Sequence, residues 1–318
     1  MPELPEVETT VRELNKKVKG KTILDVWTDY SSNYKHYKDQ VKNPKYFSGF
    51  KKRIEGKKIK EVKRRGKNIL IHLSSGDVIL IHMKMTGHLI FGKYIMQNKK
   101  KKSTIQNLPE KWEKETWIPD EPHTSPLWDS YNRHIHLVFS LSGGRKLILS
   151  DARKFARVRI IDRDELENIK EIQNLGPNPL DIPEERFIDR LNTRQSGKIK
   201  QVLMDQNVLA GIGNIYSDEA LWKVGVLPAS NLKKIPRKEL GRLYKAVQDV
   251  LKKGIAFGGD STSDYRAPDG KKGSFQHKHN VYRKKGEKCS MKKCSGIIKR
   301  SVVGGRSTHF CDTHQKKY

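Results

Sequence analysis

The first apolar residues of the chain recur at the spacing of a helix. Five of them follow one another at intervals of three and four residues: Leu4, Val7, Val11, Leu14 and Val18. This pattern predicts an amphipathic helix over residues 3–19 with one apolar face. Pro2 suits the start of a helix, and Glu3 and Glu6 suit the positive end of its dipole. Gly20 suits its end.

Alternation of apolar and polar residues replaces the helical spacing after residue 20. Seven short runs are rich in Val, Ile and Leu: "TILDVW", "KIKEVKR", "NILIHL", "DVILIHM", "HIHLVFSL", "RKLILSD" and "ARVRIID". Such runs, broken by Gly, Ser and Asn, predict antiparallel strands that form a sandwich or a barrel. Residues 96–130, with the run "NKKKK" and four prolines, interrupt the series and predict a long surface insertion.

The second half of the chain has a different pattern. The proline-rich stretch "LGPNPLDIP" at 175–183 predicts a connector and a domain boundary. Residues 184–257 contain helical segments such as "EERFIDRLNT" and "RKELGRLYKAVQDVLKKGI". Residues 258–280 are rich in Gly, Ser, Asp and Lys and have few apolar anchors, so we expect a mobile loop there. A small Cys/His module at 281–318 completes the chain.

Charge indicates the class of partner. The 318 residues contain 65 Lys and Arg against 36 Asp and Glu, a formal net charge of +29. Such an excess predicts a polyanionic partner, most simply nucleic acid, although a lysine-rich composition can also merely cover solvated faces. The excess is concentrated in residues 271–318, where Glu287 and Asp312 are the only acidic residues.

The sequence also indicates a compartment. No apolar run reaches the length of a membrane span, and the N-terminus lacks the basic and apolar regions of a secretory signal. We therefore expect a protein of the cytoplasm and no membrane partner; association with a bacterial nucleoid is implied only by the family resemblance described below. The three cysteines are clustered near the C-terminus, which favours a metal site or free thiols over a disulfide framework.

Two close pairs of metal-binding residues stand near the C-terminus, in the order Cys289-x4-Cys294-x16-Cys311-x2-His314. This spacing fits a tetrahedral structural zinc; the alternative is three unconnected buried thiols. The sixteen residues between the pairs have the length of a β-hairpin with a Gly-Gly turn. His309 is a competing nitrogen ligand, but His314 has the better spacing. A metal held by four protein ligands is structural rather than catalytic.

A glycine-rich turn joins two helical stretches in "VLAGIGNIYSDEALW", residues 208–222. Glycine lets a backbone approach a ligand closely, and the first N–H groups of the next helix favour an anion. With the amide side chain of Asn214, this turn can hold a phosphate. The alternative is a plain joint between two packed helices.

The N-terminus has two interpretations. It is either an ordinary helix start or, if Met1 is removed, a reactive secondary amine on Pro2. An α-amino group has a pKa of about 7.7–8.0, so part of it is neutral near pH 7. A neutral amine can form an iminium with a sugar aldehyde, and Glu3 and Glu6 can transfer protons beside it.

Eight motifs follow one another in an order that points to one family: "MPELPEVETT", "RRGKNILIHL", "IHMKMTGHL", "DARKF", "LGPNPL", "LMDQNVLAGIGNIYSDEALW", "GGDSTSDY" and "DGKKGSFQHKHNVY". With the terminal Cys/His module, the series resembles the formamidopyrimidine-DNA glycosylase (MutM) family. Its members are bifunctional base-excision repair enzymes related to endonuclease VIII. The resemblance covers the whole chain except the 96–130 insertion.

The resemblance implies an α+β fold. Its parts are an N-terminal helix with a β-sandwich, a helical helix–two-turns–helix domain and a C-terminal β-hairpin zinc finger, with DNA in the cleft between the two halves. The implied segments are a catalytic domain at 1–174, a linker at 175–183, the helix–two-turns–helix domain at 184–257, a lesion-capping loop at 258–280 and the zinc finger at 281–318. A monomer is also implied.

The resemblance also implies catalytic roles. Pro2 matches the nucleophile that attacks C1′ of the damaged nucleotide. Glu3 matches the general acid/base, and Glu6 supports the site. Lys67, in "RRGK", matches a lysine that binds the phosphate next to the lesion.

Further positions match DNA-binding residues of the family: His82, Met85, Arg153, Phe155, Lys198, Asn214 and Arg306. Asn214 and Arg306 match contacts to the same backbone as Lys67, and such contacts offset the cost of flipping a nucleotide. Met85, Arg153 and Phe155 match the triad that fills the space of the flipped base, although Met85 and Phe155 also suit ordinary core packing. His82 is either a structural histidine or a phosphate contact, and we do not expect it to be catalytic.

The chain departs from the family pattern in its zinc finger, where the first gap has four residues and His314 replaces the last cysteine. Ala152 and Ala156 stand where proline and glycine are common, beside Arg153. The insertion has no family role, and its Lys99–Lys102 run suits either flanking DNA or solvent.

These observations predict a DNA glycosylase and AP lyase that removes oxidised purines, mainly 8-oxoguanine and formamidopyrimidines. The reaction passes through an N-terminal proline iminium and β,δ-elimination. The expected partner is double-stranded DNA with oxidised bases or abasic sites, and the expected cofactor is one structural Zn²⁺. The alternatives are an endonuclease VIII-like glycosylase for oxidised pyrimidines and a non-catalytic protein that binds damaged DNA.

Overall fold

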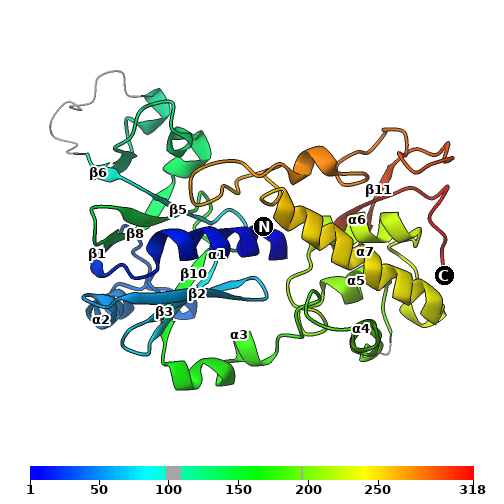
Figure 1. Ribbon diagram of the computed structural model, residues 1–318, viewed down its shortest axis with the longest axis horizontal. Coiled ribbons are helices and arrows are strands. Elements are labelled where there is room, and N and C mark those ends of the chain that lie inside the picture. The colour runs from blue at the N-terminus through cyan, green and yellow to red at the C-terminus, as the bar shows by residue number, and fades with distance from the viewer. Residues whose placement is uncertain (98–108, 195) are drawn as a thin grey trace. The chain divides into compact units, whose positions relative to one another are not determined.

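The chain forms two units of secondary structure, labelled in Figure 1, in a computed structural model that describes residues 1–97, 109–194 and 196–318. The first unit consists of Met1–Pro2, Glu6–Glu167 and Gly258–Gly273. The second consists of Glu3–Pro5, Asn168–Phe257 and Ser274–Tyr318. The chain therefore passes from one unit to the other several times: near its N-terminus, after residue 167, and at residues 258 and 274.

Two antiparallel sheets of four strands make up most of the first unit (Figure 1). One has the strand order β1-β8-β9-β5 and the other has the order β10-β4-β3-β2. The strands are β1 (Ile23–Thr28), β2 (Ile59–Arg65), β3 (Asn68–Leu73), β4 (Val78–His82), β5 (His88–Gly92), β8 (Ile135–Leu141), β9 (Lys146–Ser150) and β10 (Arg157–Ile161). Each of the seven predicted runs forms one of these strands. β5 was not predicted: all five of its residues are buried, and apolar and polar residues do not alternate along it.

Helix α1 (Leu4–Val18) packs on the apolar core between these sheets. Val7, Val11, Leu14 and Val18 belong to that core, as their spacing predicts. The predicted α+β class and the N-terminal helix are confirmed.

A second helix, α2 (Pro44–Ile54), was not predicted, although its start carries a clear signal. The Asn43 side chain accepts hydrogen bonds from the amides of Lys45 and Tyr46, and Pro44 occupies the first helical position.

The described part of the 96–130 insertion forms an apolar layer on one sheet. Strands β6 (Tyr94–Met96) and β7 (Trp117–Pro119) pair with each other. Trp112, Trp117 and Trp128 are buried against the outer face of the sheet that contains β5, β8 and β9. Residues 109–130 are therefore more than the surface loop that their composition predicts, while Lys99–Lys102 lie outside the described residues.

The second unit consists of helices around one apolar cluster, followed by a hairpin. The helices around the cluster are α4 (Glu184–Asn192), α5 (Ile199–Met204), α6 (Asn214–Val224) and α7 (Arg237–Ala256), and the short helix α3 (Lys170–Gln173) precedes them in the chain. The hairpin strands are β11 (Lys299–Val303) and β12 (Arg306–Phe310). Gly304 and Gly305 between them have φ values of 58° and 72°, which fits the predicted Gly-Gly turn.

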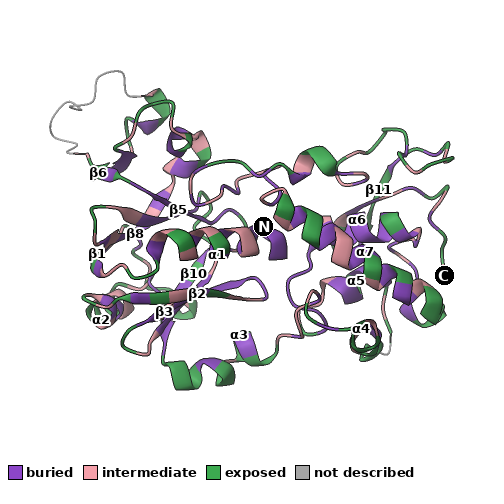
Figure 2. Ribbon diagram, viewed as in Figure 1, coloured by how far each residue is buried: buried purple, intermediate pink, exposed green. Residues whose placement is uncertain are grey.

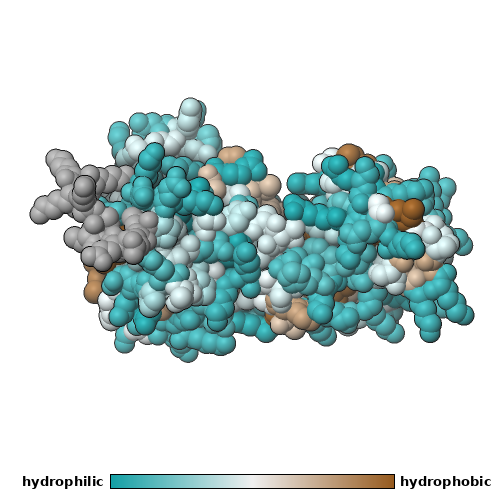
Figure 3. All heavy atoms as spheres, turned by 90° about the horizontal axis from the view of Figure 1, so that it is seen from above, coloured by the Kyte–Doolittle hydropathy of each residue, from teal (hydrophilic) through white to brown (hydrophobic). Residues whose placement is uncertain are grey.

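Short 3₁₀ helices complete the two units, at Lys35–Tyr37, Glu110–Trp112, Pro126–Trp128, Ser130–Arg133, Arg163–Asn168, Leu232–Lys234 and Phe275–Lys278. Figure 2 shows buried positions along one side of α1 and through α6. The face drawn in Figure 3 is mainly hydrophilic, with small separate apolar areas. No helix among the described residues is both long and apolar enough to cross a bilayer.

Candidate active site and nucleic-acid interface

The carboxylate of Glu3 lies at the start of α6. Its oxygens accept hydrogen bonds from the backbone N–H groups of Ile215, at 2.9 Å, and Tyr216, at 3.4 Å. The side chain is 3% exposed. A helix N-terminus favours a negative charge, so α6 fixes this carboxylate and its orientation.

The two glycines of the "GIG" turn make this arrangement possible. A Cβ atom on Gly213 would lie 2.3 Å from Cδ of Glu3. Gly211 has a φ of 111°, and a Cβ atom there would lie 2.7 Å from the Leu4 side chain. The anion at these helix amides is thus a carboxylate of the chain itself, and the sequence did not predict this pairing.

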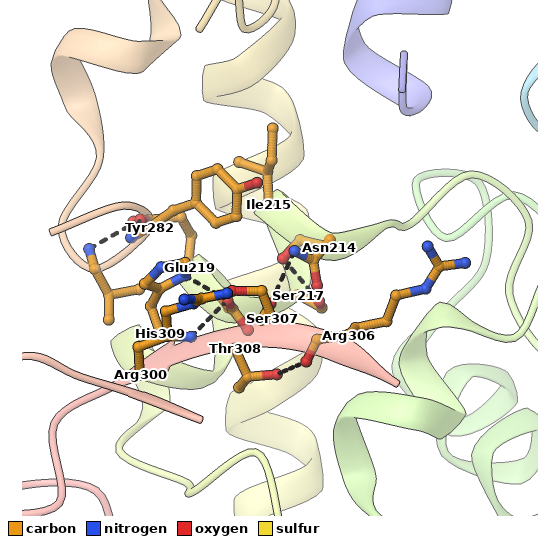
Figure 4. A network of polar contacts seen from close by, with 12 residues as sticks. Asn214, Ile215, Ser217, Glu219, Tyr282, Arg300, Arg306, Ser307, Thr308 and His309 are labelled. Carbon is orange, nitrogen blue, oxygen red and sulfur yellow. Dashed lines mark hydrogen bonds and ion pairs between the residues drawn. The ribbon is translucent and has the colours of Figure 1, made fainter. Parts of the chain in front are cut away.

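Asn214, in the same turn, contacts the hairpin that carries Arg306 (Figure 4). Its Nδ2 atom donates to the Ser307 carbonyl oxygen at 3.0 Å. Arg300 donates from Nε to the Ser307 hydroxyl at 2.6 Å. Arg306 itself is exposed at the start of β12. The structure therefore brings two of the predicted phosphate contacts into the same part of the second unit.

A buried ion pair between α5 and α6 contacts the hairpin β11–β12. Nζ of Lys200 lies 2.6 Å from Oδ1 of Asp218, and both side chains are fully buried. Lys200 also donates to the Thr308 hydroxyl at 2.8 Å, and the His309 backbone N–H donates to Asp218 at 2.9 Å. Burial lowers the pKa of Lys200, and Asp218 opposes that shift. We call β11–β12, with these contacts to α5 and α6, the docked hairpin.

Four side chains of types that bind metal ions lie close together in residues 281–318. The ligand atoms of Cys289, Cys294, Cys311 and His314 all lie within 4.8 Å of one another. Sγ of Cys289 is 3.3 Å from Nδ1 of His314, and Sγ of Cys294 is 3.7 Å from Sγ of Cys311. The competing residue His309 instead faces Asp218. The predicted set of four residues can therefore hold one metal ion.

Trp222 of α6 contacts two of these four residues, and no pattern in the sequence predicts this contact. Its indole Nε1 donates to Sγ of Cys289 at 3.3 Å. Its carbonyl oxygen lies 3.0 Å from Nε2 of His314. A proton on Nε2 leaves Nδ1 of His314 as the metal-binding nitrogen, so α6 selects the tautomer that suits the cluster.

Glu6 has a different set of partners from Glu3. The backbone N–H of Asp260 donates to Oε1 of Glu6 at 2.8 Å, and the side chain is 2% exposed. Gly259, with a φ of 86°, allows this approach. The Tyr265 hydroxyl donates to the Glu6 carbonyl at 3.1 Å. Glu6 thus ties the segment 258–273 to α1 within the first unit.

Lys67 and His82 are neighbours in the second sheet. Lys67 stands in the turn between β2 and β3 and is buried, and Asn68 pairs with His82. Burial, with the charges of Lys84 and Lys67, lowers the pKa of His82 to about 3. Its Nδ1 atom accepts from the backbone N–H of Lys84 at 3.0 Å. A neutral, hydrogen-bonded ring favours the structural interpretation of His82.

Met85, Arg153 and Phe155 lie on two exposed turns that are joined beneath the surface. Met85 is 38% and Phe155 is 45% exposed, and the guanidinium carbon of Arg153 lies 4.6 Å from the Phe155 ring centroid. Buried Asp151 accepts bonds from the Thr86 hydroxyl and from the Ala156 N–H. Thr86 in turn accepts from the Arg153 N–H at 3.1 Å. We call residues 82–86 and 151–156 the paired turns.

Lys42 is a further support of the paired turns that the sequence did not indicate. Its ammonium donates to the carbonyl of Lys154, a residue with a φ of 55°, and lies 4.6 Å from the Tyr37 ring centroid. Burial lowers the pKa of Lys42 to about 8, against the opposing charge of Asp151.

The remaining predicted residues occupy separate places. Pro2 is buried and belongs to the first unit, whereas Glu3 belongs to the second. Lys198 is exposed directly before α5. The second unit thus collects Glu3, Asn214 and Arg306, and the first collects Glu6, Lys67 and the paired turns.

Comparison with known proteins identifies the family. Residues 1–158 match the formamidopyrimidine-DNA glycosylase N-terminal domain, and residues 175–266 match the formamidopyrimidine-DNA glycosylase H2TH domain. The chain is 34% identical to the formamidopyrimidine-DNA glycosylase of Pelotomaculum thermopropionicum, over 99% of both chains. It is 33% identical to that of Bacillus cereus, over the full length of both.

Solved structures agree with these relatives. A complex of the Lactococcus lactis Fpg with DNA containing an abasic site has a TM-score of 0.77 at 29% identity, over 99% of this chain and 100% of the other. A complex of a mutant of the same protein with Fapy-dG DNA has the same TM-score at 30% identity and the same coverage. The chain therefore belongs to the formamidopyrimidine-DNA glycosylase family, and it is a DNA glycosylase that acts on damaged bases.

Proposed function

We propose that this glycosylase removes oxidised purines and then cleaves the abasic strand, with the amine of Pro2 as its nucleophile once Met1 is removed. One observation carries the proposal: the residue after Pro2 is Glu3, whose carboxylate two amides of α6 hold in place. A fixed carboxylate next to an amine is the pairing that acid–base and covalent catalysis require. The finding that relatives were solved with Fapy-dG and abasic DNA supports the same substrate class.

The proposed reaction begins with attack of the neutral Pro2 amine on C1′ of the flipped nucleotide. The bond from C1′ to the base breaks, and the base leaves with its electron pair and a proton. The sugar ring opens as the amine lone pair forms an iminium at C1′. Loss of a C2′ proton then expels the 3′ phosphate, and loss of a C4′ proton expels the 5′ phosphate. Water finally hydrolyses the bond between C1′ and the Pro2 nitrogen and frees the amine. Glu3 transfers protons in these steps, and Glu6 supports the site.

Other side chains would hold the DNA. Lys67, Asn214 and Arg306 bind phosphates beside the lesion in this proposal, and Lys198 lies along the same backbone, whereas His82 keeps its structural role. Contacts of this kind fix the register of the duplex. Met85, Arg153 and Phe155 fill the space of the flipped base, and their exposure on the paired turns supports this role. Residues 258–280 close over the flipped base.

We also propose that the cluster of Cys289, Cys294, Cys311 and His314 holds one Zn²⁺. Three thiolates and one imidazole suit tetrahedral zinc. The four ligand atoms lie within 4.8 Å of one another, which is close enough for one ion to contact all of them. Zinc with four protein ligands would fix the fold of residues 281–318 and take no part in the chemistry.

The test compares base excision from two matched duplexes. One contains 8-oxoguanine opposite cytosine, and the other contains thymine glycol opposite adenine. We expect excision from the first to be faster by about tenfold or more, as a pocket that pairs with polar groups of its base discriminates strongly. Faster excision of thymine glycol would assign the enzyme to oxidised pyrimidines instead. Binding of both duplexes without excision would favour the non-catalytic alternative.

A further inference from the structure

We propose that Arg266 and Asp129 form an anchor that holds the segment 258–273 against the insertion, and that this anchor sets the rate of base excision but not of abasic-site cleavage. The inference rests on the proposed function, in which this segment closes over the flipped base. Asp129 lies within the insertion, near its C-terminal end, and Arg266 lies within the segment, so the insertion acquires a positioning role.

Arg266 joins the segment to the protein beneath it. Its side chain is 1% exposed, and Nε lies 3.0 Å from Oδ2 of Asp129. The guanidinium carbon lies 4.5 Å from the ring centroid of Tyr131. Loss of the carboxylate would leave the buried guanidinium without its counter-charge, which costs far more than the loss of a surface ion pair.

The same guanidinium organises the segment itself. Nη1 donates to the carbonyl oxygens of Ser263, at 3.0 Å, and Tyr265, at 2.8 Å. The Ser261 hydroxyl donates to the Tyr265 carbonyl at 2.8 Å and accepts from the Gly273 N–H at 2.9 Å. Arg266 therefore links the internal bonds of the segment to its outside anchor.

Backbone contacts also hold the segment 258–273 against the strand β5 and the insertion. The Phe91 N–H donates to the Pro268 carbonyl at 2.7 Å. Gly270, with a φ of 83°, lies so close to Pro126 that an added Cβ atom would be 2.8 Å from its carbonyl group. The segment thus lies directly on β5 and on residues of the insertion.

The insertion offers a firm platform. Leu127 and Trp128, directly before Asp129, are buried in the apolar layer on the sheet. The Asn132 side chain donates to the carbonyls of Pro126, at 3.0 Å, and Leu127, at 3.3 Å, and its oxygen lies 3.0 Å from Nε2 of His88 in β5. The position of Asp129 is therefore set by a core and by a strand.

These contacts separate two steps of the reaction. A segment that is already ordered loses little conformational entropy when it closes on a base. An abasic site has no base to enclose, so strand cleavage there does not need the closed segment. Loss of the anchor should slow the first step alone.

The experiment measures kcat/KM on 8-oxoguanine opposite cytosine and on a preformed abasic site, with full-length protein. For Arg266→Met we expect excision to fall about tenfold or more and abasic cleavage to stay within about twofold. Arg145→Met is the matched control, because Arg145 pairs with Glu121 of the same insertion at 3.8 Å but is 42% exposed in its side chain. We expect it to alter neither activity.

Equal loss of both activities, or loss of neither, would overturn the anchor. If Arg266→Met does not fold, Asp129→Asn is tested instead, because it keeps the shape of the Asp129 side chain and removes its negative charge. Hydrogen exchange at amides 260–273 gives a second readout: it should accelerate in the variant and be unchanged in Arg145→Met. Unchanged exchange there would also refute the anchor. Wild-type protein that lacks both activities would contradict the proposed function, while hydrogen exchange would still decide the anchor.

Discussion

The paired turns and the docked hairpin present exposed side chains for DNA in two different ways. Beneath the paired turns, the buried carboxylate of Asp151 accepts bonds from a hydroxyl and a backbone N–H, and the strands that lead into the turns belong to the sandwich. Beneath the docked hairpin lie the Lys200–Asp218 ion pair and the Cys/His cluster.

The difference shows what each region needs in order to hold its shape. Two sheets and a large apolar core position the paired turns. The region around the hairpin has one small buried apolar cluster, in which Val281 and Ile298 pack with Trp222 of α6. A buried charge pair and a candidate metal site add to it. Small modules of this kind depend on such additions because they bury too little apolar surface.

Metal removal should have the largest effect on this comparison. Chelation, or Cys289→Ser, should unfold residues 281–318 and abolish DNA binding, since a structural zinc site contributes folding free energy directly. The sandwich should keep its own unfolding transition. Calorimetry with a DNA-binding titration measures both. Full DNA binding by metal-free protein would remove zinc from the account.

The buried ion pair should come next. Asp218→Asn leaves the ammonium of Lys200 buried without its counter-charge, so we expect a loss of about 3–5 kcal/mol in the unfolding free energy of the second unit. Asp249→Asn is the control, because its pair with Lys223 is solvent-exposed and should contribute less than about 1 kcal/mol. Urea unfolding compares the two variants, and equal small losses would show that the hairpin does not depend on this pair.

The paired turns should respond less strongly. Asp151→Asn removes the acceptor for the Ala156 N–H or the Thr86 hydroxyl, and an unsatisfied buried group costs about 1–3 kcal/mol. Asp162→Asn serves as the control, because the Asp162 side chain is 58% exposed in its pair with Arg53. Urea unfolding of the two variants compares their losses of unfolding free energy. A loss for Asp151→Asn no greater than the loss for Asp162→Asn would mean that the sandwich alone positions the turns.

Lys42 should give the smallest effect, visible only at alkaline pH. Its pKa in the folded chain is about 8, below its usual value of 10.5, because burial disfavours the ammonium. The unfolded chain therefore binds more protons than the folded chain between pH 8 and pH 10.5, and stability rises with pH in that window. Relative to Lys42→Met, the wild type should gain about 1 kcal/mol between pH 8 and pH 9. A constant difference would contradict the assigned pKa.

Regular periodicity made much of the fold predictable. The five apolar residues of α1 and the seven runs rich in Val, Ile and Leu correspond to the helix and to seven strands, because these apolar residues form the buried core. β5 was not predicted: its five residues are all buried, and its sequence "HLIFG" does not alternate. The Trp-rich stretch 109–130 looks like a loop in sequence because its core forms only against strands far away in the chain.

The site was predictable where residues act through local sequence. The Cys/His spacing identified the four residues that converge, and the turns identified exposed tips. Contacts between distant segments left no such signal: Glu3 with the amides of α6, Trp222 with Cys289, and Lys42 with Lys154. Each of these contacts joins residues that lie far apart in the sequence, and two of them involve backbone groups, which every residue has. No local sequence pattern can therefore predict them.

The most direct test of the central claim is covalent trapping at Pro2. Wild-type protein, with Met1 removal verified by mass spectrometry, is incubated with an abasic duplex and sodium borohydride. An iminium between the Pro2 amine and C1′ would be reduced to a stable amine, so we expect a protein–DNA adduct whose modified peptide begins at Pro2. Protein that retains Met1 should give none. Absence of the adduct from the processed wild type would contradict the proposed mechanism.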